Sequence, residues 1–183
     1  MDMAMNDPKA LRILIVKLSA IGDVIHALPA LNALKRRFPD TRIDWLVEEE
    51  AASLLPGHPA LARVIVCPRK RWMKAIKGSN GRDGGAVFRS LRKFVRDLRR
   101  TRYDLIFDFQ NLLKSALWVA VARGERKVGF GRGLQHSEGS YLFYNQRVPA
   151  ASMEVHALER YLLLLKSVGI DDTTVTYDLP MSD

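Results

Sequence analysis

A short and almost purely apolar run constrains the fold of this chain more than any other feature. Residues 11–16 read Leu-Arg-Ile-Leu-Ile-Val. A run that is apolar on both alternating faces and rich in β-branched side chains indicates a strand covered on both sides, as in a parallel sheet. Apolar residues at helical spacing follow within residues 24–38, at Val24, Ala27, Leu28, Leu31 and Leu34. A buried strand followed by such a helix predicts a βα unit.

The alternation of strands and helices continues along the chain. Further strands are predicted at residues 42–47, 63–66, 103–109 and 126–130, and further helices at 48–55, 86–100, 111–123 and 153–168. Pro29 is expected to kink the first helix or to shift its start. Glycines and the lack of a core pattern predict a mobile loop over residues 68–85, and residues 175–179 suggest a strand or linker. The fold class is α/β, with a Rossmann-like, doubly wound parallel sheet.

Length and composition narrow the class of protein. The 183 residues suit one domain or two small ones, and Cys67 is the only cysteine, which excludes an intrachain disulfide. We expect a disordered or tag-like start at residues 1–10, a domain over 11–170 and the start of a linker at 171–183. Neither a secretory signal nor a bilayer-spanning run of about 20 apolar residues is present. A cytoplasmic protein is therefore expected.

The positive charge is concentrated in one segment. Residues 63–102 hold 14 Lys and Arg but only two Asp, a net of +12, whereas the remaining chain has a net of −3. Such a segment indicates either a local anionic partner or a solvated basic face. The helix at 86–100 has an apolar stripe and a basic face, for which a solvated surface is favoured over contact with anionic lipid. A polyanion-binding module such as an RNA binder is an alternative, but Trp72 stands nearly alone as a stacking residue. We expect no nucleic-acid partner.

The first loop of the sheet carries the candidate chemistry. Residues 17–23 read Lys-Leu-Ser-Ala-Ile-Gly-Asp and lack the glycine patterns of dinucleotide sites and P-loops. Asp23 lies where a helix begins. Its position fits a residue that caps this helix as well as it fits a functional carboxylate. A functional Asp23 needs a partly buried cleft, because the helix dipole favours its charged form. His26, one turn later, could hydrogen-bond to it. The four histidines show no metal-ligand spacing, so no metal is predicted.

Several motifs resemble the lipopolysaccharide heptosyltransferases of glycosyltransferase family 9. Residues 17–31 resemble the opening signature of that family. Four further matches follow in order, at residues 44–49, 70–72, 108–116 and 142–145. The elements at 44–49 and 70–72 are most similar to heptosyltransferase I. Together the motifs cover roughly residues 11–169, and five ordered motifs are much more specific than one.

The resemblance implies an inverting GT-B glycosyltransferase with two Rossmann-like domains, of which this chain is the N-terminal, acceptor-binding half. The implied reaction transfers heptose from ADP-L-glycero-D-manno-heptose to the Kdo sugar of Kdo-lipid A. The donor would bind mainly to the absent C-terminal domain, and no tightly bound cofactor is implied. The acceptor lies in the inner face of the cytoplasmic membrane, so a peripheral membrane location is expected. The chain by itself is expected to be inactive.

Site residues carry over by position in the motifs. Asp23 matches the catalytic aspartate, a general base for the attacking Kdo hydroxyl, and Ser19 and Gly22 line the same turn. Lys70, Arg71 and Lys74 match a basic cluster for acceptor phosphates and carboxylates. Near residues 129–139 the sequence departs from the Arg-Glu of the family, and Arg132 or His136 could substitute. Heptosyltransferase II, which adds the second heptose, remains an alternative.

Overall fold

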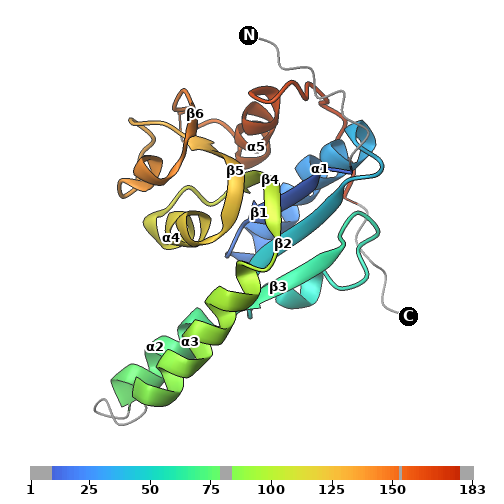
Figure 1. Cartoon of the computed structure of the whole chain (residues 1–183). Helices are drawn as coiled ribbons and strands as arrows, with labels where there is room; N and C mark the ends of the chain where they lie inside the picture. The colour runs from blue at the N-terminus through green and yellow to red at the C-terminus, as the bar shows by residue number, and fades with distance from the viewer. Residues whose placement is uncertain (1–9, 79–83, 153, 178–183) are drawn as a thin grey trace.

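Six parallel strands form a single sheet in the computed structural model, which describes residues 10–78, 84–152 and 154–177. The strands are β1 (Arg12–Val16), β2 (Arg42–Glu48), β3 (Arg63–Cys67), β4 (Arg102–Asp108), β5 (Arg123–Phe130) and β6 (Gln146–Val148). Their order is β3-β2-β1-β4-β5-β6 (Figure 1). The order reverses between β1 and β4, so this pair is the topological switch point of a doubly wound sheet.

Helices cover both faces of this sheet. They are α1 (Ile21–Arg37), α2 (Arg69–Gly78), α3 (Gly84–Leu98), α4 (Leu113–Val121) and α5 (Ala157–Lys166), with short 3-10 turns η1 (Ala52–Leu54) and η2 (Ser140–Phe143). Strand β1 divides its side chains between two cores: Ile13 and Ile15 pack with α1 and α5, whereas Leu14 and Val16 pack with the residues of α2, α3 and α4. The α/β class and the parallel sheet are thus as predicted.

The first helix is longer than its sequence pattern indicated. Helix α1 begins at Ile21, three residues before the predicted start, and continues through the buried Pro29 to Arg37. A start shifted by Pro29 is therefore wrong. The basic residues Lys35, Arg36 and Arg37 occupy the last turn, where cations complement the helix dipole.

The expectation of a mobile loop over residues 68–85 is wrong for its first half. Residues 69–78 form helix α2, which lies beside α3 in an antiparallel pair that projects from the sheet (Figure 1). Trp72 is the reason, because its ring packs against Phe94 of α3 and Trp118 of α4, and its Nε1 donates to Ser90 Oγ at 3.0 Å. Residues 79–83 lie outside the described ranges. We call α2 and α3 the α2–α3 hairpin.

The remaining differences between the predicted and the observed elements each concern a short segment. The helix predicted at 48–55 reduces to η1, because Glu48 belongs to β2. Strand β6 and turn η2 were not predicted. Residues 175–177 form no strand, and 178–179 lie outside the described part. Within the described part of the chain, no helix has the length and apolar character to span a bilayer.

Candidate active site

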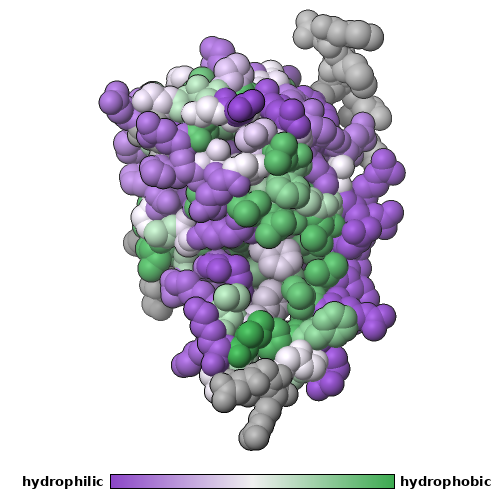
Figure 2. All heavy atoms as spheres, turned by 90° about the vertical axis from the view of Figure 1, so that its left-hand side faces the viewer, coloured by the Kyte–Doolittle hydropathy of each residue, from purple (hydrophilic) through white to green (hydrophobic). Residues whose placement is uncertain are grey.

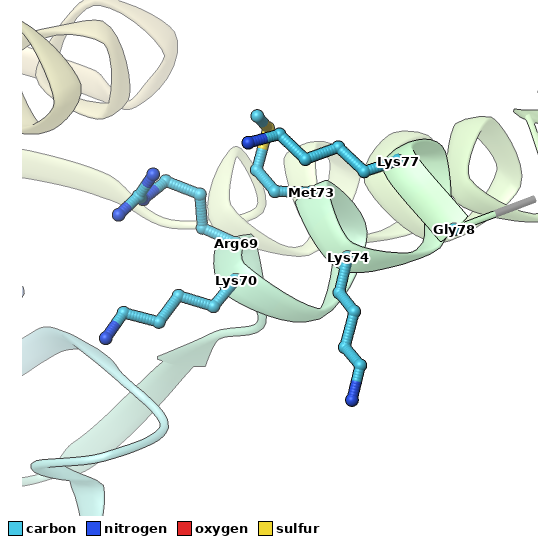
Figure 3. Close-up of a pocket in the computed structure, with 6 residues that line it drawn as sticks. All are labelled: Arg69, Lys70, Met73, Lys74, Lys77 and Gly78. Atoms are coloured by element: carbon cyan, nitrogen blue, oxygen red, sulfur yellow. The ribbon is translucent and has the colours of Figure 1, made fainter. Parts of the chain in front are cut away.

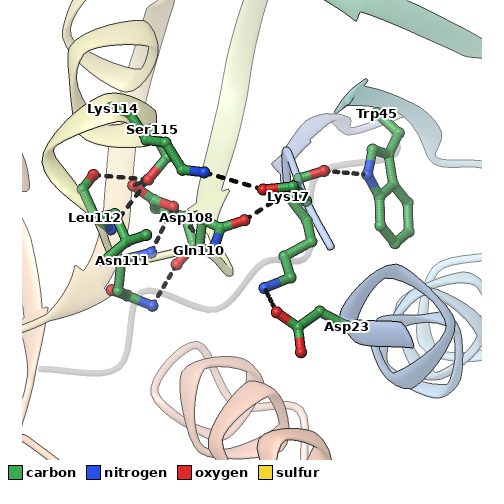
Figure 4. A network of polar contacts seen from close by, with 10 residues as sticks. Lys17, Asp23, Trp45, Asp108, Gln110, Asn111, Leu112, Lys114 and Ser115 are labelled. Carbon is green, nitrogen blue, oxygen red and sulfur yellow. Dashed lines mark hydrogen bonds and ion pairs between the residues drawn. The ribbon is translucent and has the colours of Figure 1, made fainter. Parts of the chain in front are cut away.

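The loop after β1 is held in place by both neighbouring strands. Lys17 N donates to Leu46 O of β2 at 3.2 Å, and Phe109 N, just beyond β4, donates to Val16 O at 3.0 Å. The indole Nε1 of the buried Trp45 donates to Lys17 O at 3.2 Å (Figure 4). The loop therefore has a defined shape at the carboxyl edge of the sheet. It lies at the switch point between β1 and β4, where ligands bind in open α/β sheets.

Asp23 projects from the first turn of α1 and forms an ion pair with Lys17. Lys17 Nζ donates to Asp23 Oδ2 at 3.0 Å (Figure 4). The lysine side chain is only 3% exposed, whereas the aspartate side chain is 46% exposed. The N-cap residue of α1 is Ala20, not Asp23, and it makes no side-chain capping bond with any described residue. The capping role that the sequence allowed for Asp23 is therefore wrong.

The ion pair lies beside an aromatic ring in a small cavity. The Lys17 ammonium lies 5.7 Å from the centroid of the Tyr161 ring of α5. Burial lowers the pKa of Lys17, and the nearby Asp23 carboxylate opposes this effect. The cavity of about 150 Å³ is lined by residues that include Asp23, Lys17, Gln110, His136, Arg160 and Tyr161. The Asp23 carboxylate therefore lies at a small cavity that has both polar and apolar walls, and it is itself partly open to solvent.

A second lysine reaches the same loop from α4. Lys114 Nζ donates to Ser19 Oγ at 2.9 Å, and Ser19 N donates to Gln110 Oε1 at 3.1 Å. In Figure 4 the side chains of Lys114 and Gln110 extend toward the loop that carries Lys17. Ser19, predicted from sequence, is thus bound to two residues that follow β4. Gly22 is exposed, and a Cβ added there would meet nothing within 4 Å, so the space beside this turn is open.

The turn that carries Gln110 is organised by a fully buried carboxylate. Asp108 Oδ1 accepts bonds from Gln110 N and Asn111 N, and its Oδ2 accepts bonds from Ser115 Oγ and Tyr144 OH, all between 2.8 and 3.0 Å. Burial raises the pKa of Asp108 to about 6, and these hydrogen bonds act in the opposite direction. Asp108 shapes the loop and does not line the cavity.

Of the two residues predicted to replace the Arg-Glu pair of the family, only one lies at the cavity. His136 lines the cavity with Asp23, whereas Arg132 is exposed and is not among the lining residues. The expected bond between His26 and Asp23 is absent, because the His26 ring meets His156 edge-on at 5.0 Å and its buried Nδ1 has no partner in the described ranges.

The predicted basic cluster lies on α2, apart from the cavity. Lys70 and Lys74 line an open hollow of about 450 Å³ on this helix (Figure 3). Lys70 Nζ lies 2.6 Å from Glu50 Oε1, and Arg71 forms an ion pair with Glu49. Lys74 makes no hydrogen bond or ion pair with any described residue. Two of the three predicted phosphate ligands are therefore already occupied by carboxylates.

The fold is a Rossmann-like, doubly wound domain with a candidate site at its topological switch point. Residues 91–183 match glycosyltransferase family 9 (heptosyltransferase). The chain belongs to this family.

The chain is similar to named heptosyltransferases in sequence and in structure. The chain is 40% identical over 151 residues to lipopolysaccharide heptosyltransferase 1 of Pseudomonas aeruginosa, with 82% of this chain and 40% of that protein covered. It is 36% identical over 162 residues to the Salmonella typhimurium protein of the same name, with 88% and 49% covered. The structure of E. coli heptosyltransferase WaaC with ADP-2-deoxy-2-fluoro heptose matches with a TM-score of 0.78 and 34% identity, over 91% of this chain and 51% of that one. The chain thus spans about half the length of these relatives, and its fold corresponds to the N-terminal half of GT-B heptosyltransferases.

Sequence reasoning assigned no role to Lys17, Gln110 or Lys114, although all three lie in motifs that it singled out. The available signal was position, because Lys17 directly follows β1, and Gln110 and Lys114 lie two and six residues after the end of β4. That β1 and β4 are neighbours could not be read from the motifs, since the chain places other strands between them.

Proposed function

We propose that this chain is the acceptor-binding half of an inverting heptosyltransferase that transfers heptose from ADP-L-glycero-D-manno-heptose to the Kdo of the lipopolysaccharide inner core. Family membership and the names of its relatives support the reaction class. The observation that carries the proposal is the placement of Asp23. Its carboxylate is 46% exposed at the switch point and is held by the buried Lys17.

Asp23 is assigned as the general base. Asp23 Oδ2 bonds to Lys17, and its Oδ1 makes no bond with any described residue, so this oxygen is available to a ligand. It would take the proton of the Kdo hydroxyl while that oxygen bonds to the anomeric carbon and the bond to ADP breaks on the opposite face. A single displacement of this kind inverts the anomeric centre. A positioned base contributes typically 10²–10⁴-fold to such a step.

The acceptor is an anion, and this part of the chain offers cations in two places, on α4 beside the first loop and on α2. Lys114 lies on the same loop network, and Lys74 is free on α2. Ser19 and Gly22 belong to the same turn as Asp23, and His136 lines the cavity beside it. The donor nucleotide would be bound mainly by a second domain. Lys70 and Arg71 could contact acceptor phosphates after displacing Glu50 and Glu49.

A chimera tests the proposal. This chain, joined to the second half of the E. coli heptosyltransferase WaaC, should release ADP from ADP-heptose only when a Kdo-lipid A acceptor is present. Asp23→Asn in the chimera should lower the rate by about 10²–10⁴. The matched control, Asp40→Asn, removes an exposed carboxylate from the turn after α1 and should leave the rate unchanged. Full activity of the Asp23→Asn chimera would refute the base, and transfer to a different core sugar would favour heptosyltransferase II.

A further inference from the structure

The ammonium of Lys17 is enclosed by the protein but only partly bonded to it. The lysine side chain is 3% exposed, and its Nζ makes one hydrogen bond with the described residues, to Asp23 Oδ2 at 3.0 Å. In Figure 4 the side chain ends at this single contact. An ammonium has three N–H donors, so two donors have no acceptor among the described residues. A buried charge with unused donors is costly unless a further partner binds it.

The same ammonium lines the small cavity beside Asp23. The charged lining residues are Lys17, Arg160 and Asp23, so cations outnumber acids there. One wall is the ring of Tyr161, whose centroid lies 5.7 Å from Lys17 Nζ. Burial lowers the pKa of Lys17, and the positive charge of Lys114 on α4 acts in the same direction. The electrostatic potential in the cavity therefore favours an anionic group.

The size of the cavity indicates what kind of anion fits. Its volume is about 150 Å³, whereas pockets that enclose a whole small-molecule ligand are typically about 300–1,000 Å³. The cavity therefore suits one functional group of a larger ligand better than a complete sugar. Kdo is a sugar acid, and its carboxylate is an anionic group of suitable size.

Exposed cations of the chain are less able to select such a group. Lys74 and Arg92 are exposed on the α2–α3 hairpin. Figure 2 shows hydrophilic residues along both sides of a hydrophobic band on one face of the molecule. Water and salt screen charges on such surfaces, so an exposed ion pair contributes little. The enclosed ammonium of Lys17 lies in a medium of lower dielectric constant, where a hydrogen-bonded anion is held more strongly.

We propose that Lys17 binds the carboxylate of the acceptor sugar and thereby releases Asp23 from its ion pair. The proposal rests on the proposed function, which supplies the acceptor and the role of Asp23. Two carboxylates would compete for one ammonium. A neighbouring cation favours the charged form of a carboxylate and opposes its uptake of a proton.

Transfer of the ammonium from Asp23 to the acceptor removes this opposition. Asp23 then takes the proton of the attacking hydroxyl, and Lys17 keeps its own proton throughout. An acceptor without a carboxylate would leave Lys17 on Asp23. The lysine would therefore select acidic acceptors and make the activation of the base depend on them.

Nuclear magnetic resonance titration of the 183-residue chain tests the proposal without a donor. The probes are the methyl glycoside of Kdo and the methyl ester of this glycoside, which lacks the charge. The parent chain should bind the acid more tightly than the ester. Lys17→Met should bind both equally, because the carboxylate loses its partner. The matched control, Lys35→Met, removes a lysine from the last turn of α1, where Nζ donates to Thr41 O, and should keep the preference of the parent chain.

Asp23→Asn should change binding in the opposite direction. It removes the competing carboxylate, so the affinity for the acid should rise at least about tenfold while the affinity for the ester stays the same. The double variant Lys17→Met/Asp23→Asn should lose this gain, because the gain depends on the released ammonium. A purely structural role for Lys17 predicts no gain in Asp23→Asn. Thermal melts verify that each variant is folded.

Three results would overturn the proposal: equal binding of acid and ester by the parent chain, no binding of the acid, or a gain that persists in the double variant. Tighter binding of ADP by Asp23→Asn, in place of the sugar acid, would also overturn it, because the anion at Lys17 would then belong to the donor. The proposed function fails separately. Titrations with the expected pattern, together with a chimera that releases no ADP, would refute the transfer and leave the carboxylate site in place.

Discussion

Lys17 Nζ lies 3.0 Å from Asp23 Oδ2 across the first loop of the sheet, and the two partners differ sharply in burial. The ammonium is almost fully enclosed, whereas the carboxylate remains accessible to a ligand. This asymmetry has a physical consequence. Removing the cation leaves a carboxylate that water can solvate, but removing the carboxylate leaves a buried charge without its counterion.

The first prediction follows from this asymmetry. Lys17→Met should change the free energy of unfolding by less than about 1 kcal/mol, whereas Asp23→Asn should lower it by about 1–3 kcal/mol. The double variant Lys17→Met/Asp23→Asn should recover the stability of Lys17→Met but not transfer activity. Urea denaturation and the ADP-release assay measure the two properties. Equal destabilisation by the two single variants would contradict the arrangement described.

The second prediction concerns the buried carboxylate that ends β2. Glu48 is 2% exposed and its Oε1 accepts from Arg69 Nε at 2.6 Å, while its buried Oε2 has no described partner. Arg69→Met should therefore lower the free energy of unfolding by about 3 kcal/mol. Lys70→Met is the control, since its partner Glu50 is 61% exposed, and it should cost at most about 0.5 kcal/mol. Similar losses for both variants in urea denaturation would argue against a buried pair.

The third prediction addresses competition for the basic cluster. Glu50 occupies Lys70, so acceptor phosphate must displace this carboxylate before it can bind there. Glu50→Gln should lower the KM for a phosphorylated acceptor in the chimera, with kcat nearly unchanged, and Lys74→Ala should raise that KM. A dephosphorylated acceptor should show much smaller effects. If both variants act equally on the two acceptors, this cluster does not bind phosphate.

The fourth prediction uses the pKa of Asp108. The folded-state pKa of about 6 exceeds the ordinary 3.8, so the folded state binds this proton more tightly than the unfolded state. Protonation of Asp108 therefore stabilises the folded state below about pH 4. This stabilisation is lost as the pH rises through 6, which lowers the free energy of unfolding by about 3 kcal/mol. Asp108→Asn should remove this loss.

Urea denaturation at acidic and neutral pH measures the difference between variant and parent. Asp172 gives the opposite dependence of stability on pH, because its hydrogen bond from Arg36 lowers its pKa to about 2. Its contribution is present above about pH 4 and is lost as the pH falls through 2, the opposite sign. A parent chain and Asp108→Asn with parallel pH profiles would show that Asp108 is not the group that titrates.

Many of the strands and helices could be predicted from the spacing of apolar residues over short stretches of the sequence. The apolar run of β1 and the helical spacing of Val24 to Leu34 report which faces are buried, and each βα unit is built from residues close in the chain. Asp23 could be placed at the carboxyl edge of the sheet in the same way, because it follows β1 within one βα unit. Helix α2 escaped prediction because its stability depends on Trp72 meeting Phe94 and Trp118, which are distant in sequence.

The sequence by itself determined the α/β class, the buried strands and the position of Asp23 after the first strand, because hydrophobic periodicity encodes which residues are buried. Only the tertiary structure decided that β4 lies beside β1, which brings Gln110 and Lys114 to Ser19, and that acids at the end of β2 and in the turn after it form ion pairs with the cations of α2. Strand order and ion pairing depend on contacts between residues far apart in the chain, and periodicity carries no record of which distant partner each residue meets.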